Sequence, residues 1–134
     1  MKAKIYYHHT DAGGVVYYAS YLQFLEEART GVLARAGIDM NELIRQGRFF
    51  VVIRQELDYL SPAFYGDILD INTRIKDISA VRITFEHQIK NQNGRVVARA
   101  KTTLAHINND FKPIVIPEDM RVSLDEYKGE ESPC

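Results

Sequence analysis

The chain has 134 residues, with 17 basic and 18 acidic side chains and a net charge of −1 at pH 7. This length predicts one domain that can fold without disulfides or metals, and the scattered charges argue against a nucleic-acid groove or a basic membrane patch. The single cysteine, Cys134, ends a polar tail, and no apolar run reaches membrane-spanning length, so we expect a soluble, cytoplasmic protein without a signal peptide or membrane insertion.

The N-terminal segment predicts a short strand, a loop and a long helix. The strand covers Ala3–His8, and the loop after it contains Asp11 followed by two glycines. Ser20 and Gln23 form a capping-box pattern, which predicts a helix that begins at Ser20 and runs to about Ala36. Because a helix N-terminus presents unpaired N–H groups and a partial positive charge, a carboxylate and an anion-stabilising dipole would lie close together, as carbonyl chemistry requires.

The long helix is apolar over a broad arc, which predicts that it belongs to the core. The arc consists of Tyr21, Leu22, Phe24, Leu25, Ala28, Val32, Leu33 and Ala36. Gly37 is placed to end this helix. A second capping box, Asp39 with Glu42, predicts a short helix that Gly47 closes.

From Phe49 onward the apolar residues follow a period of two, which predicts strands. Four of them are expected, at Phe49–Leu60, Ile68–Lys76, Val81–Lys90 and Val96–Ile107. The dipeptide Asn93-Gly94 predicts a hairpin between the last two. Each strand has an apolar face that needs a cover, and the long helix is the sizeable apolar helix available. The predicted fold class is therefore α+β, with one long central helix wrapped by a curved antiparallel sheet of about five to six strands.

The C-terminal part predicts edge pairing and a last helix. Ile114–Ile116 is expected to pair at a sheet edge, and Pro117 to start a helix whose Met120, Leu124 and Tyr127 share a face. We therefore expect one domain over residues 1–128 and a disordered tail at 129–134.

Two longer motifs stand out in the sequence. They read D-A-G-G-V-V-Y-Y-A-S-Y-L-x-F-x-E-x-A-R from Asp11 to Arg29 and Y-L-S-P-A-x-Y-G-D from Tyr59 to Asp67. Both resemble the hotdog-fold acyl-CoA thioesterases of the 4-hydroxybenzoyl-CoA thioesterase family, especially the branch associated with the bacterial Tol-Pal system. The resemblance covers nearly the whole chain and implies hydrolysis of an acyl-CoA to a free acid and CoA. It also implies a homodimer or a dimer of dimers, with the active site at the dimer interface.

By this resemblance, Asp11 is the catalytic carboxylate, acting as nucleophile or general base, and the backbone N–H of Tyr18 donates to the thioester carbonyl. The expected substrate-binding residues are Gly14, Val15, Tyr17 and Tyr21. The tyrosines would line an acyl pocket, although aromatic residues at this spacing are as often simple core residues. No cofactor or metal is expected.

Two residues depart from the Tol-Pal branch. Tyr18 stands where that branch commonly has a histidine, and His9 stands where it commonly has an acidic residue. Residues two apart in an extended segment point the same way, so we expect His9 to face Asp11. A positive charge there would keep the carboxylate ionised to lower pH.

Several other polar residues have two readings each. His8 and His9 could suggest a metal site, but adjacent histidines in a strand point to opposite faces. His87 is expected to be a hydrogen-bonded core or interface residue, and His106 similarly. Glu26 matches a glutamate of the family's helix, although solvation or pairing with Arg29 or Thr30 would explain it equally.

Arg29 falls inside the apolar arc of the long helix, so its guanidinium must find a carboxylate or carbonyl groups as partners, and we expect it to brace the fold or a dimer. The start of the Phe49–Leu60 strand is apolar on both faces, which suggests contact with another chain.

Coenzyme A carries phosphate groups, and basic side chains on the sheet and its turns are the candidates to bind them. For each of these side chains, the alternative interpretation is a solvated residue on the outer face of the sheet. The candidates are Arg54, Arg74, Lys76, Arg82, Lys90, Arg99 and Lys101.

Two rival functions remain. A hotdog enoyl-CoA hydratase would need a histidine five residues after Asp11, where this chain has Val16. A non-catalytic hotdog module would bind an acyl-CoA or join a protein complex, and thiol release from acyl-CoAs would separate it from an enzyme. The sequence leaves the acyl group open, as well as the choice between nucleophilic attack and general-base activation of water.

Overall fold

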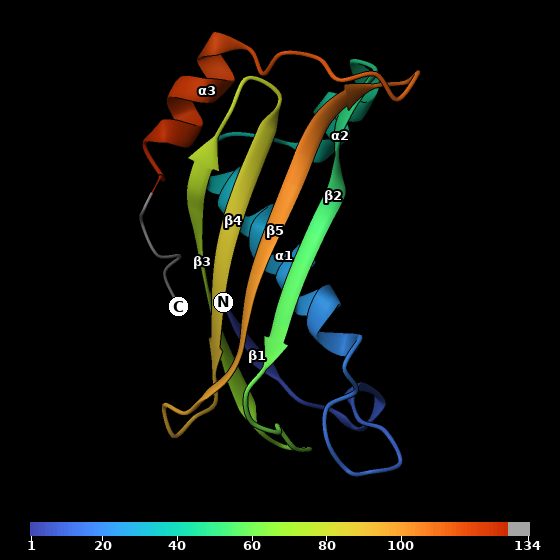
Figure 1. Ribbon diagram of the computed structural model, residues 1–134, viewed down its shortest axis with the longest axis vertical. Coiled ribbons are helices and arrows are strands. Elements are labelled where there is room, and N and C mark those ends of the chain that lie inside the picture. Colours follow the sequence, from blue (N-terminus) through green and yellow to red (C-terminus); the bar gives the residue numbers. More distant parts are fainter. Residues whose placement is uncertain (129–134) are drawn as a thin grey trace.

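The computed structural model describes residues 1–128, which form a single curved antiparallel sheet wrapped around a long helix (Figure 1). The strands are β1 Lys2–Lys4, β2 Arg48–Tyr59, β3 Ile68–Ile78, β4 Arg82–Lys90 and β5 Val96–Asn108. Their order across the sheet is β1-β3-β4-β5-β2. The helices are η1 Tyr7–His9, a 3₁₀ turn, and α1 Ser20–Arg35, α2 Met40–Arg45 and α3 Glu118–Asp125. The tail predicted at 129–134 lies outside the described residues.

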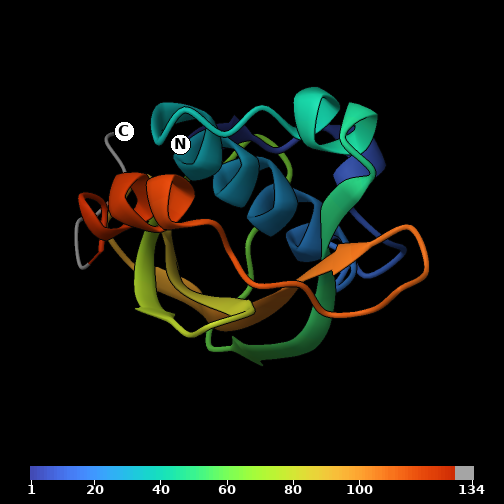
Figure 2. The ribbon, with the colours of Figure 1, turned by 90° about the horizontal axis from the view of Figure 1, so that it is seen from above.

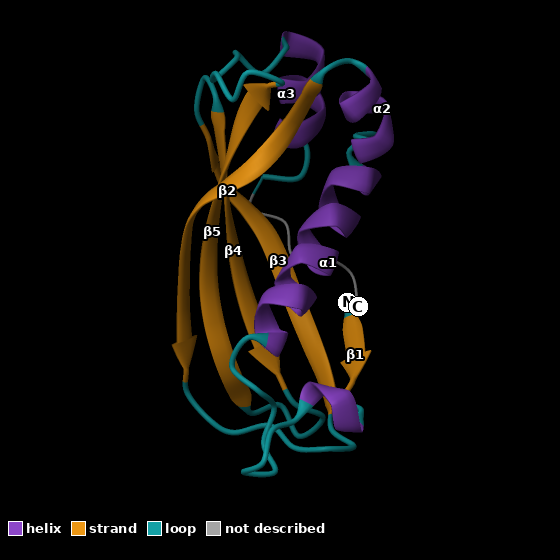
Figure 3. Cartoon of the chain, turned by 90° about the vertical axis from the view of Figure 1, so that its right-hand side faces the viewer, coloured by secondary structure: helices purple, strands orange, loops and turns teal. Residues whose placement is uncertain are grey.

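Helix α1 lies along the concave face of the sheet, and the strands curl beneath it (Figures 2 and 3). Its buried side chains belong to two apolar clusters, one that joins Leu25 to Ile71 on β3 and one that joins Leu33 to Phe85 on β4. The predicted α+β fold class and central helix are confirmed, with five strands in the described part. One residue of the predicted apolar arc was wrong, because Leu22 lies at the margin of the arc and is 43% exposed.

The start of α1 differs from the predicted capping box. The N-cap residue is Ala19, which makes no side-chain cap, and the Ser20 hydroxyl donates instead to the carbonyl of His9 at 3.1 Å. The end of α1 agrees with the prediction. Gly37 has φ of +83°, and its N–H donates to Ala34 while the next N–H donates to Leu33, a pairing that closes a helix with a left-handed glycine.

The first strand is shorter than predicted, because the chain leaves the sheet after Lys4. The backbone N–H of Tyr6 donates to Nδ1 of His9 at 2.9 Å, and the hydroxyl of Thr10 donates to the carbonyl of Tyr7 at 2.7 Å. These local side-chain contacts stabilise the 3₁₀ turn η1 over residues that would otherwise extend the strand.

The four longer strands lie within about two residues of their predicted bounds, and the inward residues of β3 and β4 are buried as expected. The hairpin at Asn93-Gly94 is confirmed, with Gly94 at φ of +80°. Strand β2 lies at the sheet edge, where Val52 and Ile53 are 49% and 45% exposed within this chain.

The short helix α2 and the C-terminal segment are close to expectation. Asp39 caps α2 by accepting from the N–H of Asn41, but Glu42 pairs with Arg45 rather than completing a capping box. Residues 114–116 make two backbone hydrogen bonds without forming a strand, with the N–H groups of residues 114 and 116 donating to the carbonyls of residues 106 and 80. The phenol of Tyr127 donates to the carbonyl of Arg35 at 2.7 Å, which ties the segment after α3 to the end of α1.

Candidate active site

The loop that carries Asp11 is a tight turn. The N–H of Asp11 donates to the carbonyl of Val15, and the N–H of Gly14 donates back to the carbonyl of Asp11, both at 3.0 Å. Gly14 has φ of +81°, a conformation that a side chain would strain. At Gly13 an added Cβ would lie 3.2 Å from Oδ1 of Asp11, and the N–H of Gly13 donates to that oxygen at 2.8 Å. Both glycines therefore help to fix the orientation of the Asp11 carboxylate.

The segment after this turn is bonded to the second sequence motif and to His9, which precedes the turn. The N–H of Val16 donates to the carbonyl of Ala63, and the N–H of Tyr17 donates to the carbonyl of His9, both at 2.8 Å. Val15 also forms a bridge with Phe64. Residues 59–67, although far away in sequence, are thus brought beside the Asp11 turn.

At the start of α1, the N–H of Ser20 donates to the carbonyl of Tyr17 at 2.9 Å, which forms a turn around Tyr18. The phenol of Tyr59, at the end of β2, donates to the carbonyl of Tyr18 at 2.9 Å. Within the described residues, the N–H of Tyr18 has no backbone or side-chain acceptor. A free N–H next to a helix N-terminus is a suitable donor for a developing oxyanion.

A cavity of about 350 Å³ lies between the Asp11 turn, the start of α1 and the end of β2. Its lining residues are Asp11, Val15, Val16, Tyr18, Tyr21, Tyr59, Leu60, Ser61 and Pro62. Four of the predicted site residues meet here, whereas Gly14 and Tyr17 lie outside the lining, and the roles of all six stay predictions. Sequence reasoning missed the contribution of Tyr59 and its three successors, although the second motif was the signal that could have found them.

Two phenols, one in the lining of this cavity and one beside it, have a raised pKa. Burial raises the pKa of Tyr21 to about 12, with smaller contributions from Tyr59 and Asp67. The pKa of Tyr17 lies above its ordinary value, first because of its hydrogen-bonding interaction with the Tyr18 side chain and also because of the Asp11 charge. These two tyrosines therefore carry neutral hydroxyl groups at physiological pH.

His9 does not lie as predicted. It belongs to η1 rather than to an extended strand, its Nδ1 accepts from Tyr6, and its ring lies 5.1 Å from that of Phe24. Burial and the neighbouring His8 lower the pKa of His9, so its imidazole is less protonated than an ordinary histidine. The expectation that a His9 cation faces Asp11 is therefore wrong.

The argument against a metal at His8 and His9 also rested on strand geometry, and that geometry is wrong. The two rings lie on the same side of the chain, with centroids 4.0 Å apart. Among residues 1–128, no group of three histidine, cysteine, aspartate or glutamate side chains is arranged to hold a metal ion.

A buried chain of hydrogen bonds crosses the sheet beneath α1. Thr73 bonds Nδ1 of His87 at 2.8 Å, Thr102 lies 3.3 Å from Nε2 of His87, and Thr102 donates to Oε1 of Gln55 at 2.8 Å. The prediction of His87 as a hydrogen-bonded core residue is confirmed. Burial, with the nearby Arg29 charge, lowers the pKa of His87 to about 3.

Arg29 and His106 are also buried polar residues that the sequence singled out. Arg29 bonds the hydroxyl of Thr102 at 3.5 Å, whereas a carboxylate or carbonyl partner was expected, and burial lowers its pKa. Glu26 accepts from the hydroxyl of Thr30 at 3.4 Å. His106 is fully buried and bonds the carbonyl of Ile114 at 3.2 Å, as expected of a core histidine.

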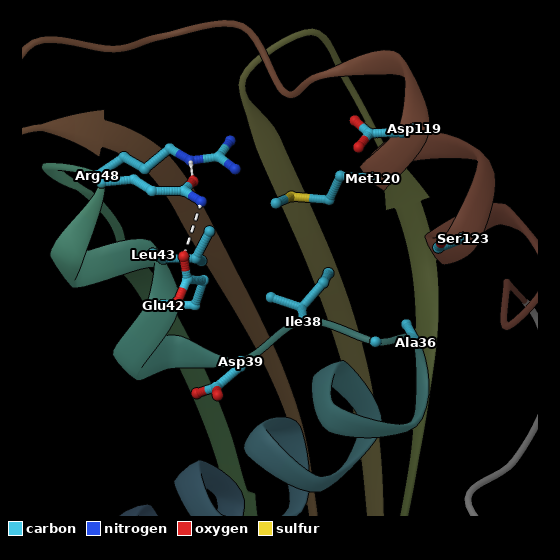
Figure 4. Close-up of a pocket in the computed structure, with 11 residues that line it drawn as sticks. Ala36, Ile38, Asp39, Glu42, Leu43, Arg48, Asp119, Met120 and Ser123 are labelled. Atoms are coloured by element: carbon cyan, nitrogen blue, oxygen red, sulfur yellow. Dashed lines mark hydrogen bonds between the residues drawn. The ribbon is translucent and has the colours of Figure 1, made fainter.

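A second cavity, of about 270 Å³, lies at the opposite end of α1, between its last turn, α2 and α3 (Figure 4). Several of its polar side chains already have partners, because Asp39 caps α2 while Glu42 accepts from Arg45 and Gln46. Arg48 donates to Gln46 at 3.0 Å. This cavity lies between helices, and none of the predicted site residues lines it.

The outer face of the sheet has two further hollows that contain some of the predicted phosphate-binding cations. One, of about 300 Å³, includes Arg74 and Arg99, and the other, of about 600 Å³, includes Arg54 and Arg82. Arg74 is paired with Glu86 across the strands. Binding of CoA phosphates by these side chains stays a prediction.

Comparison with known proteins identifies the family. The model of the Thioesterase-like superfamily matches residues 7–124 of the chain. The chain belongs to this superfamily. Its resemblance to the hotdog thioesterases, which the two motifs carried, is thereby confirmed, and as a member of the Thioesterase-like superfamily it is a thioester hydrolase.

Two curated relatives and one solved structure illustrate how close the similarity is. The acyl-CoA thioester hydrolase YbgC of Escherichia coli O6:H1 is 32% identical over 118 residues, covering 87% of this chain and 88% of the relative. The acyl-CoA thioesterase YbgC of Haemophilus influenzae is 31% identical and covers 93% of each chain. The 1,4-dihydroxy-2-naphthoyl-CoA thioesterase of Synechocystis superposes with a TM-score of 0.87 at 26% identity over 94% of each chain. No helix within residues 1–128 has the length and apolar character needed to cross a membrane.

Proposed function

We propose that this chain hydrolyses the thioester bond of an acyl-CoA to a free acid and CoA. In this proposal Asp11 attacks the thioester carbonyl directly or activates a water molecule. The N–H of Tyr18, at the start of α1, stabilises the negative charge that develops on the carbonyl oxygen.

The observation that carries the proposal is the meeting of Asp11 and Tyr18 in one cavity. Both line the 350 Å³ cavity at the N-terminus of α1. The turn that holds Asp11 leaves one carboxylate oxygen without a partner among the described residues, because the N–H of Gly13 bonds only Oδ1. A free carboxylate oxygen and a free N–H donor are the two groups that thioester hydrolysis needs.

The substrate class is inferred from the relatives and the cavity. The YbgC relatives are named for acyl-CoA hydrolysis, and the Synechocystis structure is an aryl-CoA thioesterase. The cavity walls include Val15, Tyr21 and Leu60, which suit an apolar acyl group of either kind.

The test is thiol release from a panel of aliphatic and aromatic acyl-CoAs, followed with a thiol reagent. We expect release from at least one of them and loss of that release in Asp11→Asn. Absence of release across all chain lengths would favour the alternative, a non-catalytic hotdog module.

We also propose that the chain forms a homodimer through the edge of β2, and that two dimers associate. The two sheet edges differ sharply. Strand β1 has three residues, two of them lysines, whereas β2 has twelve residues and exposes Val52 and Ile53. Short, lysine-rich edges resist pairing, and long apolar edges favour it, so β2 is the edge that fits a second copy of the chain. The end of this strand carries Tyr59 into the cavity, so the proposed interface would adjoin the site.

Val52→Lys should weaken the proposed dimer. A lysine charge buried without a partner costs about 3–5 kcal/mol, which corresponds to a dissociation constant raised roughly 100-fold or more. Sedimentation should give two or four times the 15.4 kDa chain mass for the wild type, and a lower mass for the variant. Val122→Lys is the matched control, because Val122 is similarly exposed but lies on α3. A wild type that stays monomeric at all concentrations would contradict the proposal.

A further inference from the structure

The segment that presents the Tyr18 N–H is held by hydrogen bonds from two directions. Nearby in the chain, the N–H of Tyr17 and the hydroxyl of Ser20 donate to the carbonyl of His9, and the N–H of Ser20 donates to the carbonyl of Tyr17. From the sheet, the phenol of Tyr59 donates to the carbonyl of Tyr18 at 2.9 Å across 41 residues of sequence. The ring of Tyr18 is 61% exposed and so contributes little to holding its own backbone.

The position of the Tyr18 carbonyl explains why it needs an outside donor. Tyr18 precedes the helix, and the N–H of Leu22, which could have bonded it in a longer helix, donates to Ala19 instead. Without Tyr59 the turn around residue 18 would be held only by the bond from the Ser20 N–H to the Tyr17 carbonyl and by the bonds of Tyr17 and Ser20 to His9. The N–H and the carbonyl of Tyr18 lie in successive peptide planes that meet at its Cα, so a rotation of the plane that contains the carbonyl changes the dihedral angles of residue 18 and can shift its N–H relative to the cavity.

Tyr59 is itself fixed on the rim of the cavity. It ends strand β2, and its ring makes an edge contact with the buried ring of Tyr21 at 5.5 Å. Its single hydroxyl proton is committed to the Tyr18 carbonyl, so it is not available for donation to a substrate. Its geometry suits orientation of the backbone better than contact with the acyl group.

We propose that Tyr59 is a positioning residue for thioester hydrolysis, because its phenol locks the Tyr18 backbone so that the neighbouring N–H points at the reacting carbonyl. This inference rests on the proposed function and adds to it a residue from the second motif. The effect on the reaction passes through Tyr18, which alone meets the oxyanion.

Tyr59→Phe tests the proposal, with Tyr127→Phe as the matched control. Tyr127 makes the same kind of bond, from its phenol to the carbonyl of Arg35 at the other end of α1. For Tyr59→Phe we expect kcat to fall about three- to tenfold, the effect of one lost hydrogen bond, while KM changes less than about twofold. Tyr127→Phe should leave both constants unchanged. An unchanged kcat in Tyr59→Phe, or a raised KM with constant kcat, would overturn the positioning role.

A pH profile gives a readout that a purely structural role would not move. The phenol donates only while protonated, and burial raises the pKa of Tyr59, so the wild-type bond persists at neutral pH. A fluorinated tyrosine at position 59, with a lower phenol pKa, should make kcat fall as pH rises through that lower value. A profile identical to that of the wild type would contradict the proposal.

A measurement without substrate separates this proposal from the proposed function. Backbone ¹⁵N order parameters of residues 18 and 19 should fall in Tyr59→Phe from the rigid value of about 0.85, and stay rigid in Tyr127→Phe. If the wild type released no thiol, the proposed function would fail, while the order parameters would still show whether the Tyr59 phenol restrains the Tyr18 backbone. Order parameters that are unchanged in Tyr59→Phe would overturn this restraint, even in an active enzyme.

Discussion

Asp11→Asn should lower kcat for thioester hydrolysis by about 10²- to 10⁴-fold, the usual contribution of a positioned base or nucleophile. The amide has no negative charge, so it can neither attack the carbonyl nor take a proton from water. It can still accept the hydrogen bond that Gly13 donates to Oδ1, so the turn and the fold should be retained. Steady-state kinetics on the best acyl-CoA, with circular dichroism to verify folding, measures the effect.

Asp39→Asn is the matched control for this variant. Asp39 accepts a hydrogen bond from the N–H two residues later, at 2.9 Å, in the same geometry as Asp11, but it lies at the start of α2. The control should keep wild-type kcat. Retention of half or more of the activity by Asp11→Asn would exclude it as the catalytic carboxylate.

The two roles open to Asp11 differ in the fate of an oxygen atom. A nucleophilic carboxylate forms an anhydride with the acyl group, and in a single turnover in labelled water the label can enter the Asp11 side chain. A general base leaves the side chain unlabelled, because the water oxygen goes directly to the product acid. Mass spectrometry of the peptide that contains residue 11 after one turnover distinguishes them.

The strands and the central helix could be predicted because their signals are local and repeat along the chain. Alternation along β3 and β4 identifies the buried face correctly at Ile71 and Phe85, and Gly37 marks the end of α1 through its left-handed backbone. The Asp11 turn was recognisable for the same reason. Its two glycines lie only two and three residues after the carboxylate that they orient.

The errors and omissions involve side chains that bond the backbone of another segment. Periodicity does not show that Nδ1 of His9 accepts from the N–H of Tyr6. Nor does it show that the Ser20 hydroxyl donates to the His9 carbonyl instead of capping the N-terminus of α1. The bond from Tyr59 to Tyr18 spans helices α1 and α2 and strand β2 in sequence. Such contacts depend on the folded arrangement, which explains why the second motif could be recognised as a motif but not given a role.

The hydrogen bonds of His87 show a further limit of prediction from sequence. The alternation of apolar residues places this histidine on the buried face of the sheet, but it does not identify the side chains that bond the imidazole. The Thr102 hydroxyl donates to Gln55, so its oxygen accepts from Nε2 of His87, and Nδ1 accepts from Thr73. The imidazole is therefore neutral, with its proton on Nε2. A second proton would occupy Nδ1, which could then no longer accept the hydrogen bond from the Thr73 hydroxyl, and it would place a second cation beside Arg29.

This arrangement predicts that the protein loses stability in mild acid. In the folded protein the pKa of His87 lies at about 3, below its ordinary value of 6.5. Between these two pH values His87 binds a proton in the unfolded chain but stays neutral in the folded protein. Its contribution to the free energy of unfolding is therefore complete above about pH 6.5 and declines as pH falls toward 3. Each pH unit in this window should cost about 1.4 kcal/mol of unfolding free energy, roughly 3 kcal/mol by pH 4.5.

Urea unfolding of the wild type and of His87→Gln between pH 4.5 and 7 measures this contribution. Glutamine is neutral throughout and offers both a donor and an acceptor to the two threonines, so the variant should lose stability less steeply as pH falls. Carboxylates and the other histidines titrate in both proteins, so the difference between the two curves isolates His87. The difference should shift by roughly 3 kcal/mol in favour of the variant from pH 7 to pH 4.5. Parallel curves would mean that His87 takes up its second proton in the folded state as readily as in the unfolded chain, and the hydrogen bond between Thr73 and Nδ1 would then have to run from the imidazole to the threonine.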